Sequence, residues 1–303
     1  MDFRSLKYVL EVAEQRSFSK AAEKLIIAQP SLSQYIKSIE EKLGVKLFDR
    51  NANPIRLTPE GELYVKTAYK ILAEWNELDM QLTDITNLQR GRIVLGVSQL
   101  RSSFMMAKII AQFKQRFPHI DIYFVEGTIS ELEDLMMKGR ADMFITTKPY
   151  NEVYYDSIKI CMEDLLLAVP PGHHLIKKAK QAVEKGQNVL KIFSREPFVL
   201  PLPTQRLYYN TLTLCRNAGF EPKVVIQTEN IATVVSMVTE GLGCTLLPNT
   251  LIKNGNYLHL PECFPLSDPL AQREVVFAYK KGSYMSIAAK KFIELTIKLT
   301  EED

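Results

Sequence analysis

The side chains best placed to do chemistry near the N-terminus lie on one face of a predicted helix. Between residues 29 and 43 this face is centred on Pro30, Gln34 and Lys37, with Ser33 beside them. A glutamine amide can hydrogen-bond an adenine edge, a lysine can reach guanine or phosphate, and a serine can bond either a base or a phosphate. The same face could instead simply be solvated, so the neighbouring segments have to decide between the two.

Two arginines flank a turn-rich segment that follows this helix. Asn51-Ala52-Asn53-Pro54 separates short apolar stretches at 45–48 and 55–57, which predicts two strands around a turn. Arg50 and Arg56 stand on either side, where a wing lying along a sugar-phosphate backbone would need cations. Double-stranded DNA is therefore the expected partner. The candidate DNA contacts are Ser19, Lys20, Gln29, Pro30, Ser31, Ser33, Gln34, Lys37, Arg50 and Arg56.

Polar side chains also follow the predicted strands of the remaining chain. Open α/β sheets bind ligands beyond the carboxyl ends of their strands, and helix N-termini attract anions. Arg101 and Arg206, one from each half, could clamp a carboxylate or phosphate, although both could be surface arginines and the hydroxyls could be helix caps. A small-molecule effector is expected, with an anion among the options. Its candidate contacts are Ser98, Arg101, Ser102, Thr128, Thr147, Pro203, Thr204, Arg206 and Glu229.

Residue types needed for catalysis or metal binding form no recognisable cluster. Of the four histidines only His173 and His174 are adjacent, and they follow a Pro-Pro-Gly sequence typical of a turn. Neither a GxGxxG nor a Walker-type phosphate loop occurs. The four cysteines are widely spaced and lack a CxxC pair, so reduced thiols are expected, with a redox switch between Cys215 and Cys244 as an alternative. We expect no enzyme activity, no metal and no cofactor.

Composition bounds the class of protein. The 303 residues are 46% hydrophobic and 24% charged, as in a soluble globular protein. No apolar run approaches the length of a membrane helix, and the charged first segment lacks a signal peptide's apolar core, so a cytoplasmic protein without a membrane partner is expected. Net charge only permits DNA binding: residues 1–58 hold ten Lys and Arg against seven Asp and Glu, whereas residues 59–90 hold three against six.

Three helices are predicted to position the N-terminal polar face. The first carries an apolar stripe from Phe3 to Ala13, and Ser17 and Ser19 are both candidate N-caps of a short second helix. Pro30 fits the first turn of the third helix, and Gly44 ends it. The predicted buried stripe of this third helix consists of Leu32, Ile36, Ile39 and Leu43.

A long helix with a heptad pattern follows. Thr58 is expected to cap this helix and Pro59 to open it. Apolar residues then alternate spacings of four and three over three heptads, which is typical of a helix that pairs with a partner helix; packing on its own domain is the alternative. The candidate dimer residues are Tyr64, Ala68, Ile71, Trp75, Leu78, Leu82 and Ile85.

Strands alternate with helices from residue 92 onward. Predicted strands begin at 93, 120 and 142 and again at 198, 224 and 244, so spacings of 27 and 22 residues nearly repeat as 26 and 20. Two matched α/β lobes with a cleft between them are implied, joined by crossing strands. A strand at 273–279 is expected to return to the first lobe, and a helix at 287–299 to end the fold.

Several segments together resemble one known family. SFSKAAEKL (17–25), AQPSLSQ (28–34), LGVKLFDR (43–50) and LTPEG (57–61) closely resemble the N-terminal domain of LysR-type transcriptional regulators. ENIAT (229–233), EGLG (240–243) and LLP (246–248) are similar to the second lobe of that family's effector domain, though less specifically. The resemblance implies that the helix at 29–43 enters the major groove and that the protein acts as a homodimer or homotetramer.

The chain departs from the family pattern at two positions. Ala28 stands where many members have Ser or Thr, so the usual cap of the third helix is missing unless Gln29 replaces it. The position of Thr128 is often a ligand contact in the family, but Ile129 follows it where another small polar residue is common. The polarity of the effector pocket is therefore open.

The predicted fold class is α/β with an all-α-type winged helix-turn-helix N-terminal domain, a long linker helix and a bilobal periplasmic-binding-protein-like effector domain. The expected boundaries are 1–58, 59–90 and 91–303, with lobe I at about 91–162 and 268–303 and lobe II at about 163–267. A transporter's solute-binding protein would explain only residues 92–303, and an enzyme would need a catalytic cluster. The leading hypothesis is a sequence-specific DNA-binding regulator that responds to a small molecule bound between its lobes.

Overall fold

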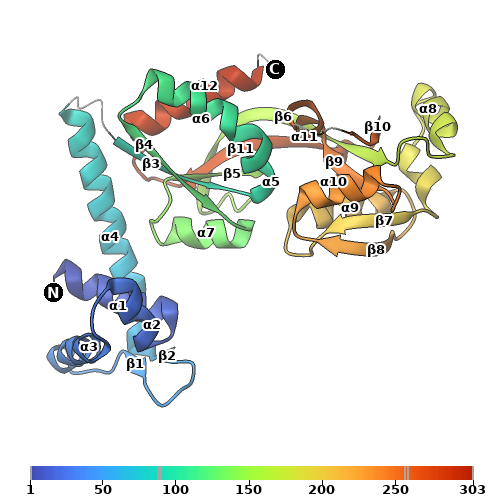
Figure 1. The fold of residues 1–303 in the computed structure, drawn as a ribbon. Coiled ribbons are helices and arrows are strands. Elements are labelled where there is room, and N and C mark those ends of the chain that lie inside the picture. Colours follow the sequence, from blue (N-terminus) through green and yellow to red (C-terminus); the bar gives the residue numbers. More distant parts are fainter. Residues whose placement is uncertain (1, 87–90, 256, 258, 302–303) are drawn as a thin grey trace. The chain divides into compact units, whose positions relative to one another are not determined.

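The structure, a computed structural model, describes residues 2–86, 91–255, 257 and 259–301 (Figure 1). The chain divides into two compact units, Met1–Asp79 and Met80–Asp303. The division falls inside the long helix α4 (Pro59–Ile85), so most of this helix belongs with the N-terminal unit. Residues 87–90, the end of the predicted linker, lie outside the described residues.

The N-terminal unit packs helices around one apolar core and carries a two-stranded wing. The wing strands are antiparallel, with Phe48 opposite Leu57 and Asp49 opposite Arg56, and they are shorter than predicted. Besides α4, the elements of this unit are α1 (Phe3–Gln15), α2 (Phe18–Leu25), α3 (Gln29–Leu43), β1 (Phe48–Asp49) and β2 (Arg56–Leu57).

Local signals determine where these helices begin and end. Of the two candidate N-caps, Ser17 caps α2, because its hydroxyl accepts from the Lys20 amide at 3.4 Å; Ser19 lies inside the helix. Gly44 ends α3 in the left-handed region, at a φ of 72°. No side chain caps α3, since its N-cap residue is Ala28 and Gln29 does not replace it.

The buried stripe predicted for α3 is confirmed except at its last position. Leu32 and Ile36 are completely buried and Ile39 nearly so, within the core that α1 and α2 complete. Leu43 is 46% exposed, because it lies in the last turn of α3 at the start of an exposed segment. The prediction for Leu43 was therefore wrong.

Helix α4 starts in close contact with the chain that leads into the wing. The Thr58 hydroxyl caps the helix by accepting from the Gly61 amide at 2.9 Å, and it donates to the Lys46 carbonyl at 2.6 Å. A Cβ atom on Gly61 would lie 2.0 Å from the Leu47 carbonyl oxygen. Only glycine therefore fits this approach of helix to backbone.

The C-terminal unit is built on two lobes, and one long strand pairs in both of them. Lobe I holds a mixed sheet in the order β4–β3–β5–β11–β6, in which β3 is parallel to β4 and β5 and the last strand, β6, spans Tyr155–Val169. Figure 1 shows α6 and α12 on one face of this sheet and α7 on the other. The elements of lobe I are β3 (Gly91–Val97), α5 (Gln99–Arg101), α6 (Ala107–Arg116), β4 (Ile120–Glu126), α7 (Ile129–Met137), β5 (Met143–Thr147), β11 (Gln272–Lys280) and α12 (Ile287–Glu301).

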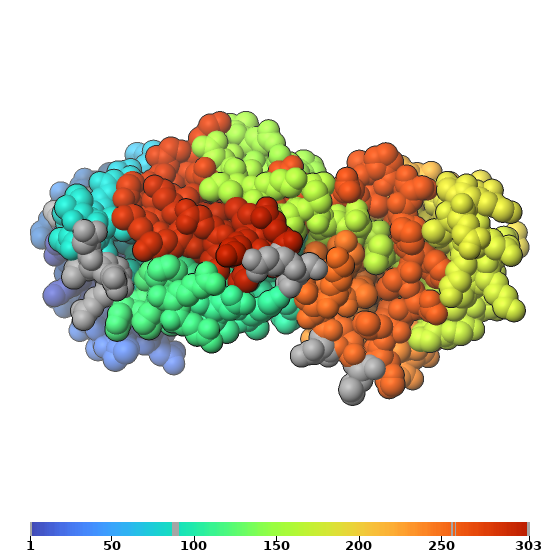
Figure 2. Space-filling view, turned by 90° about the horizontal axis from the view of Figure 1, so that it is seen from above, coloured from blue at the N-terminus to red at the C-terminus, as the bar shows by residue number. Residues whose placement is uncertain are grey.

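Lobe II repeats the alternation of strand and helix. The parallel pair β7–β8 forms its own small sheet, whereas β9 and β10 pair antiparallel with the far end of β6. In Figure 2 the two lobes are distinct masses, green and red on one side and yellow and orange on the other. The elements of lobe II are α8 (Ile176–Glu184), β7 (Pro197–Pro201), α9 (Arg206–Asn217), β8 (Lys223–Thr228), α10 (Ile231–Thr239), β9 (Thr245–Pro248), α11 (Asn249–Asn254), β10 (Glu262–Pro265) and the 3-10 turns Val189–Phe193 and Pro269–Ala271.

One crossing strand, β6 (Tyr155–Val169), was not located from the sequence. Residues 155–164 pair with β11, and residues 165–169 pair with β9 and β10. This strand is continuous through residues 162 and 163, where the lobes were expected to divide. The helical segment that follows β3 starts at α5 and passes through a π-helical turn at Ser102–Met106 before α6.

The structure also bears on the expected reduced thiols and on the expected lack of membrane-spanning helices. All four cysteines are free thiols. Burial raises the pKa of both Cys215 and Cys244 to about 12, which holds these thiols in the unreactive protonated form and weakens the redox-switch alternative. Among the described helices none is long and apolar enough to cross a bilayer.

Candidate nucleic-acid interface and ligand cleft

The outer face of α3 is polar and accessible. Gln29, Pro30, Ser31, Gln34 and Lys37 are exposed, and the opposite face supplies the buried stripe. Lys37 lies 3.8 Å from the Glu41 carboxylate, but both side chains are 62% exposed, so the pair is weak and screened. The accessible amide and hydroxyl groups of this face can therefore meet an external partner.

Arg50 is exposed, but its guanidinium is bonded to other residues of the N-terminal unit. Its Nη2 donates to the buried Glu40 carboxylate at 3.2 Å, its Nη1 donates to the Ser33 hydroxyl at 3.0 Å, and its guanidinium lies 4.8 Å from the centre of the Phe18 ring. Glu40 also accepts the backbone amides of Leu47 and Phe48. Arg50 and Ser33 thus contribute to the join between α3 and the wing, a role that sequence reasoning did not assign.

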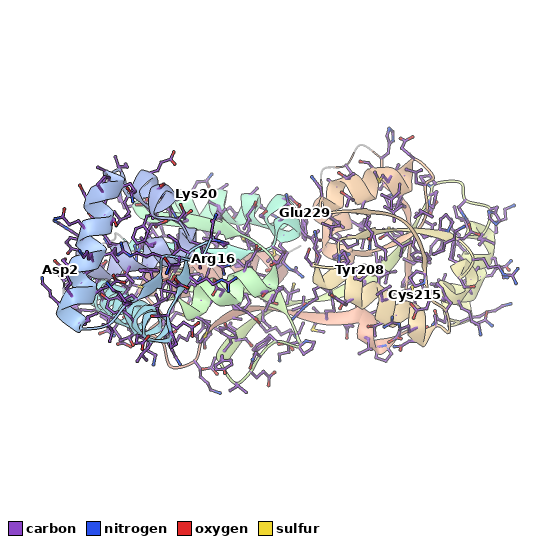
Figure 3. All side chains as sticks on the ribbon, turned by 90° about the horizontal axis from the view of Figure 1, so that it is seen from below. Asp2, Arg16, Lys20, Tyr208, Cys215 and Glu229 are labelled. Carbon is purple, nitrogen blue, oxygen red and sulfur yellow. The ribbon has the colours of Figure 1, made fainter. Side chains whose placement is uncertain are left out.

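The other predicted DNA contacts are more accessible. Ser19 and Lys20 are exposed on α2, and Arg56 is exposed on β2. Figure 3 shows Lys20 together with Arg16, which closes α1 in the left-handed region at a φ of 48°. Neither Lys20 nor Arg56 forms an ion pair with another described residue, so both cations are available to a phosphate.

The heptad residues of α4 fall into two groups. Ala68 is fully buried and Tyr64 half-buried against Leu6 and Leu10 of α1, so the alternative of packing on the same domain describes this end of the helix. The exposed fractions of Ile71, Trp75, Leu78, Leu82 and Ile85 are 37–77%, although the Trp75 ring also contacts Phe3, tilted by 55° with ring centres 4.7 Å apart. These five side chains form an apolar stripe that the described residues cover only in part.

Seven of the nine predicted effector contacts line one cleft between the lobes. Its volume is about 310 Å³, at the lower end of the range typical of small-molecule sites. Ser102 and Pro203 are not among the residues that line it. The Ser102 hydroxyl donates instead to the carboxylate of Glu126, a residue of the cleft lining. The predicted contacts that do line the cleft are Ser98, Arg101, Thr128, Thr147, Thr204, Arg206 and Glu229, the last labelled in Figure 3.

A buried ion cluster forms the floor of the cleft. Arg101 binds Glu163 with two hydrogen bonds of 3.1 and 2.8 Å, Arg273 donates to the same carboxylate, and the Thr250 hydroxyl donates to it at 2.7 Å. Burial raises the pKa of Glu163, but Arg101 and Arg273 outweigh it and lower the pKa to about 2. Arg101 is therefore neither a surface arginine nor an uncommitted anion clamp.

Arg206 is bound differently. Its Nη1 donates to the Thr147 carbonyl and lies 3.3 and 3.5 Å from the hydroxyls of Thr147 and Thr146. Burial lowers the pKa of this half-buried guanidinium, and the negative charge of Glu133 partly opposes that shift without forming an ion pair with it. Because Arg206 belongs to α9 in lobe II and Thr147 to β5 in lobe I, the contact links the two lobes across the cleft.

Of the hydroxyl groups that line the cleft, some cap helices and others are free to meet a ligand. Thr128 caps α7 in a capping box with Glu131, as the alternative interpretation had it, whereas Ser98 precedes α5 without a capping bond from its side chain. Sequence reasoning missed several cleft residues. Arg273 and Thr146 carry a readable signal, since they lie on strands that end at the cleft, but Glu163 was hidden in the unlocated strand β6. The polar lining residues that were missed are Gln99, Glu126, Glu131, Thr146 and Arg273, and the missed Glu163 binds two of the lining arginines.

Comparison with known families accounts for both units. Residues 3–62 match the family described as "Bacterial regulatory helix-turn-helix protein, lysR family", and residues 86–299 match "LysR substrate binding domain". The chain belongs to the LysR family. It is therefore a LysR-type transcriptional regulator with a helix-turn-helix and an effector-binding domain, and the solute-binding alternative is not favoured because it leaves the helix-turn-helix unexplained.

Individual relatives agree with this assignment. The HTH-type transcriptional regulator YcgK of Bacillus subtilis is 31% identical and aligns with 98% of this LysR-type chain and 94% of its own. A full-length OxyR variant from Pseudomonas aeruginosa has a TM-score of 0.70 at 23% identity, covering 98% and 94% of the two chains. Full-length CbnR complexed with its target DNA has a TM-score of 0.65 at 19% identity, covering 98% and 99%. The two structural likenesses show a shared full-length fold.

Proposed function

We propose that this LysR-type regulator reads its operator through the outer face of α3 and holds the flanking phosphates with cations of α2 and the wing. The exposed amide of Gln34, on a helix whose other face is the domain core, is the observation that supports this most strongly. An α-helix fits the major groove, and an amide side chain can bond an adenine edge in a bidentate manner.

The roles of the other residues follow from their surroundings. Gln29, Pro30, Ser31 and Lys37 share the outer face of α3 and contact bases or nearby phosphates. Ser19, Lys20 and Arg56 contact the sugar-phosphate backbone. Arg50 and Ser33 act chiefly by fixing α3 to the wing, because their side chains already bond each other.

The same proposal covers assembly, effector and location. The exposed stripe from Ile71 to Ile85 pairs two chains, as a dimer or within a tetramer, and a small molecule in the cleft changes how the paired chains meet DNA. A protein that regulates transcription by binding promoter DNA works in the bacterial cytoplasm, where that DNA lies. Regulation rather than catalysis is the function of both units.

The test is a comparison of base specificity. DNA upstream of the protein's own gene is footprinted to find a cognate site, and fluorescence anisotropy then measures binding to that site and to a scrambled duplex. We expect Gln34→Ala to lose roughly 1–3 kcal/mol of binding free energy on the cognate site and little on the scrambled one, since the substitution removes only a contact to a base.

A matched control separates base readout from general damage. Gln181 is exposed on helix α8 of the effector unit, so Gln181→Ala should leave both affinities unchanged. Equal losses on cognate and scrambled DNA for Gln34→Ala would remove Gln34 from the reading face. Added salt should weaken the binding of the protein to both duplexes, because its phosphate contacts release counterions from the DNA.

A further inference from the structure

Arg206 presents hydrogen-bond donors to the cleft that the protein does not use. Its Nη1 meets Thr147 and Thr146, but its Nη2 and Nε have no acceptor among the described residues. These two groups form one edge of the guanidinium, and such an edge matches the two oxygens of a carboxylate.

A second unused donor lies in the floor of the same cleft. The Nη2 of Arg273 donates to Glu163, while its Nε is buried and has no hydrogen-bond partner in the described chain. Arg273 is only 8% exposed, yet it lines the cleft. A buried donor left unpaired is costly, so an acceptor brought by a ligand would relieve it.

The charges around the cleft also leave a positive excess in its interior. Glu163 is one buried carboxylate shared by two buried arginines, and Arg206 adds a third cation, which forms no ion pair with a described carboxylate although the charge of Glu133 acts on it. The carboxylates that line the cleft are exposed, and Glu131 and Glu126 are occupied by Thr128 and Ser102. An anion entering the cleft therefore meets unneutralised charge at its base.

The rest of the lining is apolar on several sides. Leu100, Ile129, Ile145 and Leu207 line the cleft together with these polar groups. Resting on the effector cleft proposed above, we propose that the effector is a small monocarboxylate with a compact apolar body. Its carboxylate binds the unused edge of Arg206, and its body packs against these four side chains.

The position of Arg206 makes this contact a link between ligand and lobe closure. Arg206 already reaches from α9 to Thr146 and Thr147 on β5. A carboxylate on the same guanidinium adds a negative charge at the junction of the lobes and favours the arrangement in which both lobes enclose it. A ligand that prefers one arrangement in this way shifts the population toward it.

Calorimetry on the full-length protein tests the proposal. Monocarboxylates from acetate to benzoate are titrated, each beside its neutral amide, with inorganic phosphate as a separate arm. At least one acid with an apolar body should bind with a Kd below about 1 mM while its amide does not. Arg206→Met should weaken that binding by about tenfold or more, and Arg206→Lys should weaken it less, because the charge remains but the planar edge is lost.

The matched control lies on the same helix. Arg216 is exposed on α9 and pairs with Glu221, so Arg216→Met should bind the acids as the unaltered protein does. Equal binding of acid and amide, unchanged binding by Arg206→Met, a response to phosphate alone, or no binding of any acid would each overturn the proposal. Cognate DNA affinity measured on the same preparations distinguishes the outcomes, since intact DNA binding without acid binding refutes only the effector class.

Discussion

At the scale of single residues, the most consequential groups are two buried glutamates that hold cations in place. Glu40 ties Arg50 and the wing to α3, and Glu163 ties Arg101 and Arg273 to the floor of the cleft. Neither carboxylate is exposed by more than 2%. A buried charge of this kind is tolerated only with partners on several sides, so both sites depend on complete hydrogen bonding.

The lowered pKa of Glu163 predicts a specific dependence of the free energy of unfolding on pH. Its folded-state pKa of about 2 lies below the ordinary value of 4.5, so the folded chain binds this proton less readily than the unfolded chain. The stabilisation is thus fully present above about pH 4.5 and is lost as the pH falls toward 2. Glu163→Gln should lower the free energy of unfolding at pH 7 by roughly 3 kcal/mol and flatten its decline between pH 5 and 3.

Urea unfolding followed by circular dichroism at several pH values measures both effects. Glu221→Gln provides the comparison, since it removes the same charge from the exposed pair with Arg216 and should cost at most about 1 kcal/mol. A Glu163→Gln protein as stable at pH 7 as the Glu221→Gln protein would show that the buried cluster does not stabilise the effector unit.

At the scale of elements, the two ends of helix α4 have different surroundings and different roles. Its first turns pack on α1 and approach the wing, whereas the later turns expose apolar side chains. Near its end Asp84 accepts hydrogen bonds from the Tyr284 hydroxyl and the Ile287 amide at 2.8 and 2.9 Å, within the C-terminal unit. A single regular helix therefore takes part in both compact units.

The tight start of α4 makes Gly61→Ala a sharp test of the N-terminal packing. The added methyl group would meet the Leu47 carbonyl oxygen at 2.0 Å, and backbone cannot yield as a flexible side chain can. We expect a loss of roughly 1–3 kcal/mol in the stability of the helix-turn-helix unit and weaker binding to all DNA. Thermal unfolding and anisotropy measure these two effects.

Gly91→Ala is the control for that substitution. A Cβ atom there would lie 3.5 Å from the Cβ of Ala288, an ordinary contact, so stability and DNA binding should be nearly unchanged. If Gly61→Ala behaved like Gly91→Ala, the close approach of α4 to the wing segment would not hold in solution.

At the scale of the whole molecule, the exposed stripe of α4 is the feature that a single chain leaves incomplete. We expect Leu78→Asp to abolish dimerisation and DNA binding together, because it places a charge in the centre of the paired stripe. Leu78 is 45% exposed in the chain, so the substitution does not damage a core. Sedimentation velocity and anisotropy on the same protein provide the readout.

Leu63→Asp is the control that separates the effect of a charge in the stripe from the effect of a charge elsewhere on the same helix. Leu63 is 67% exposed on α4 but lies outside the heptad positions, so this variant should remain a dimer and bind DNA. A Leu78→Asp protein that still sedimented as a dimer would refute the stripe as the pairing surface.

Periodicity and short motifs were enough to predict most elements of this protein. The helix-turn-helix, the long helix and the repeated strand order depend on local hydrogen bonds and on alternation of apolar residues, which are written in consecutive positions. The Ser17 and Thr58 caps and the Gly44 helix end were likewise predictable, since each acts within three or four residues of itself.

Tertiary structure alone decided which polar residues are available to contact DNA or an effector. Arg50 and Arg101 looked like external contacts, but Glu40 and Glu163 lie 10 and 62 residues away along the chain and neutralise them in the fold. Arg206 kept unused donors because the described residues bring acceptors only to its Nη1. The charge of a residue follows from its type, whereas the partners that use up that charge are set by packing between distant segments.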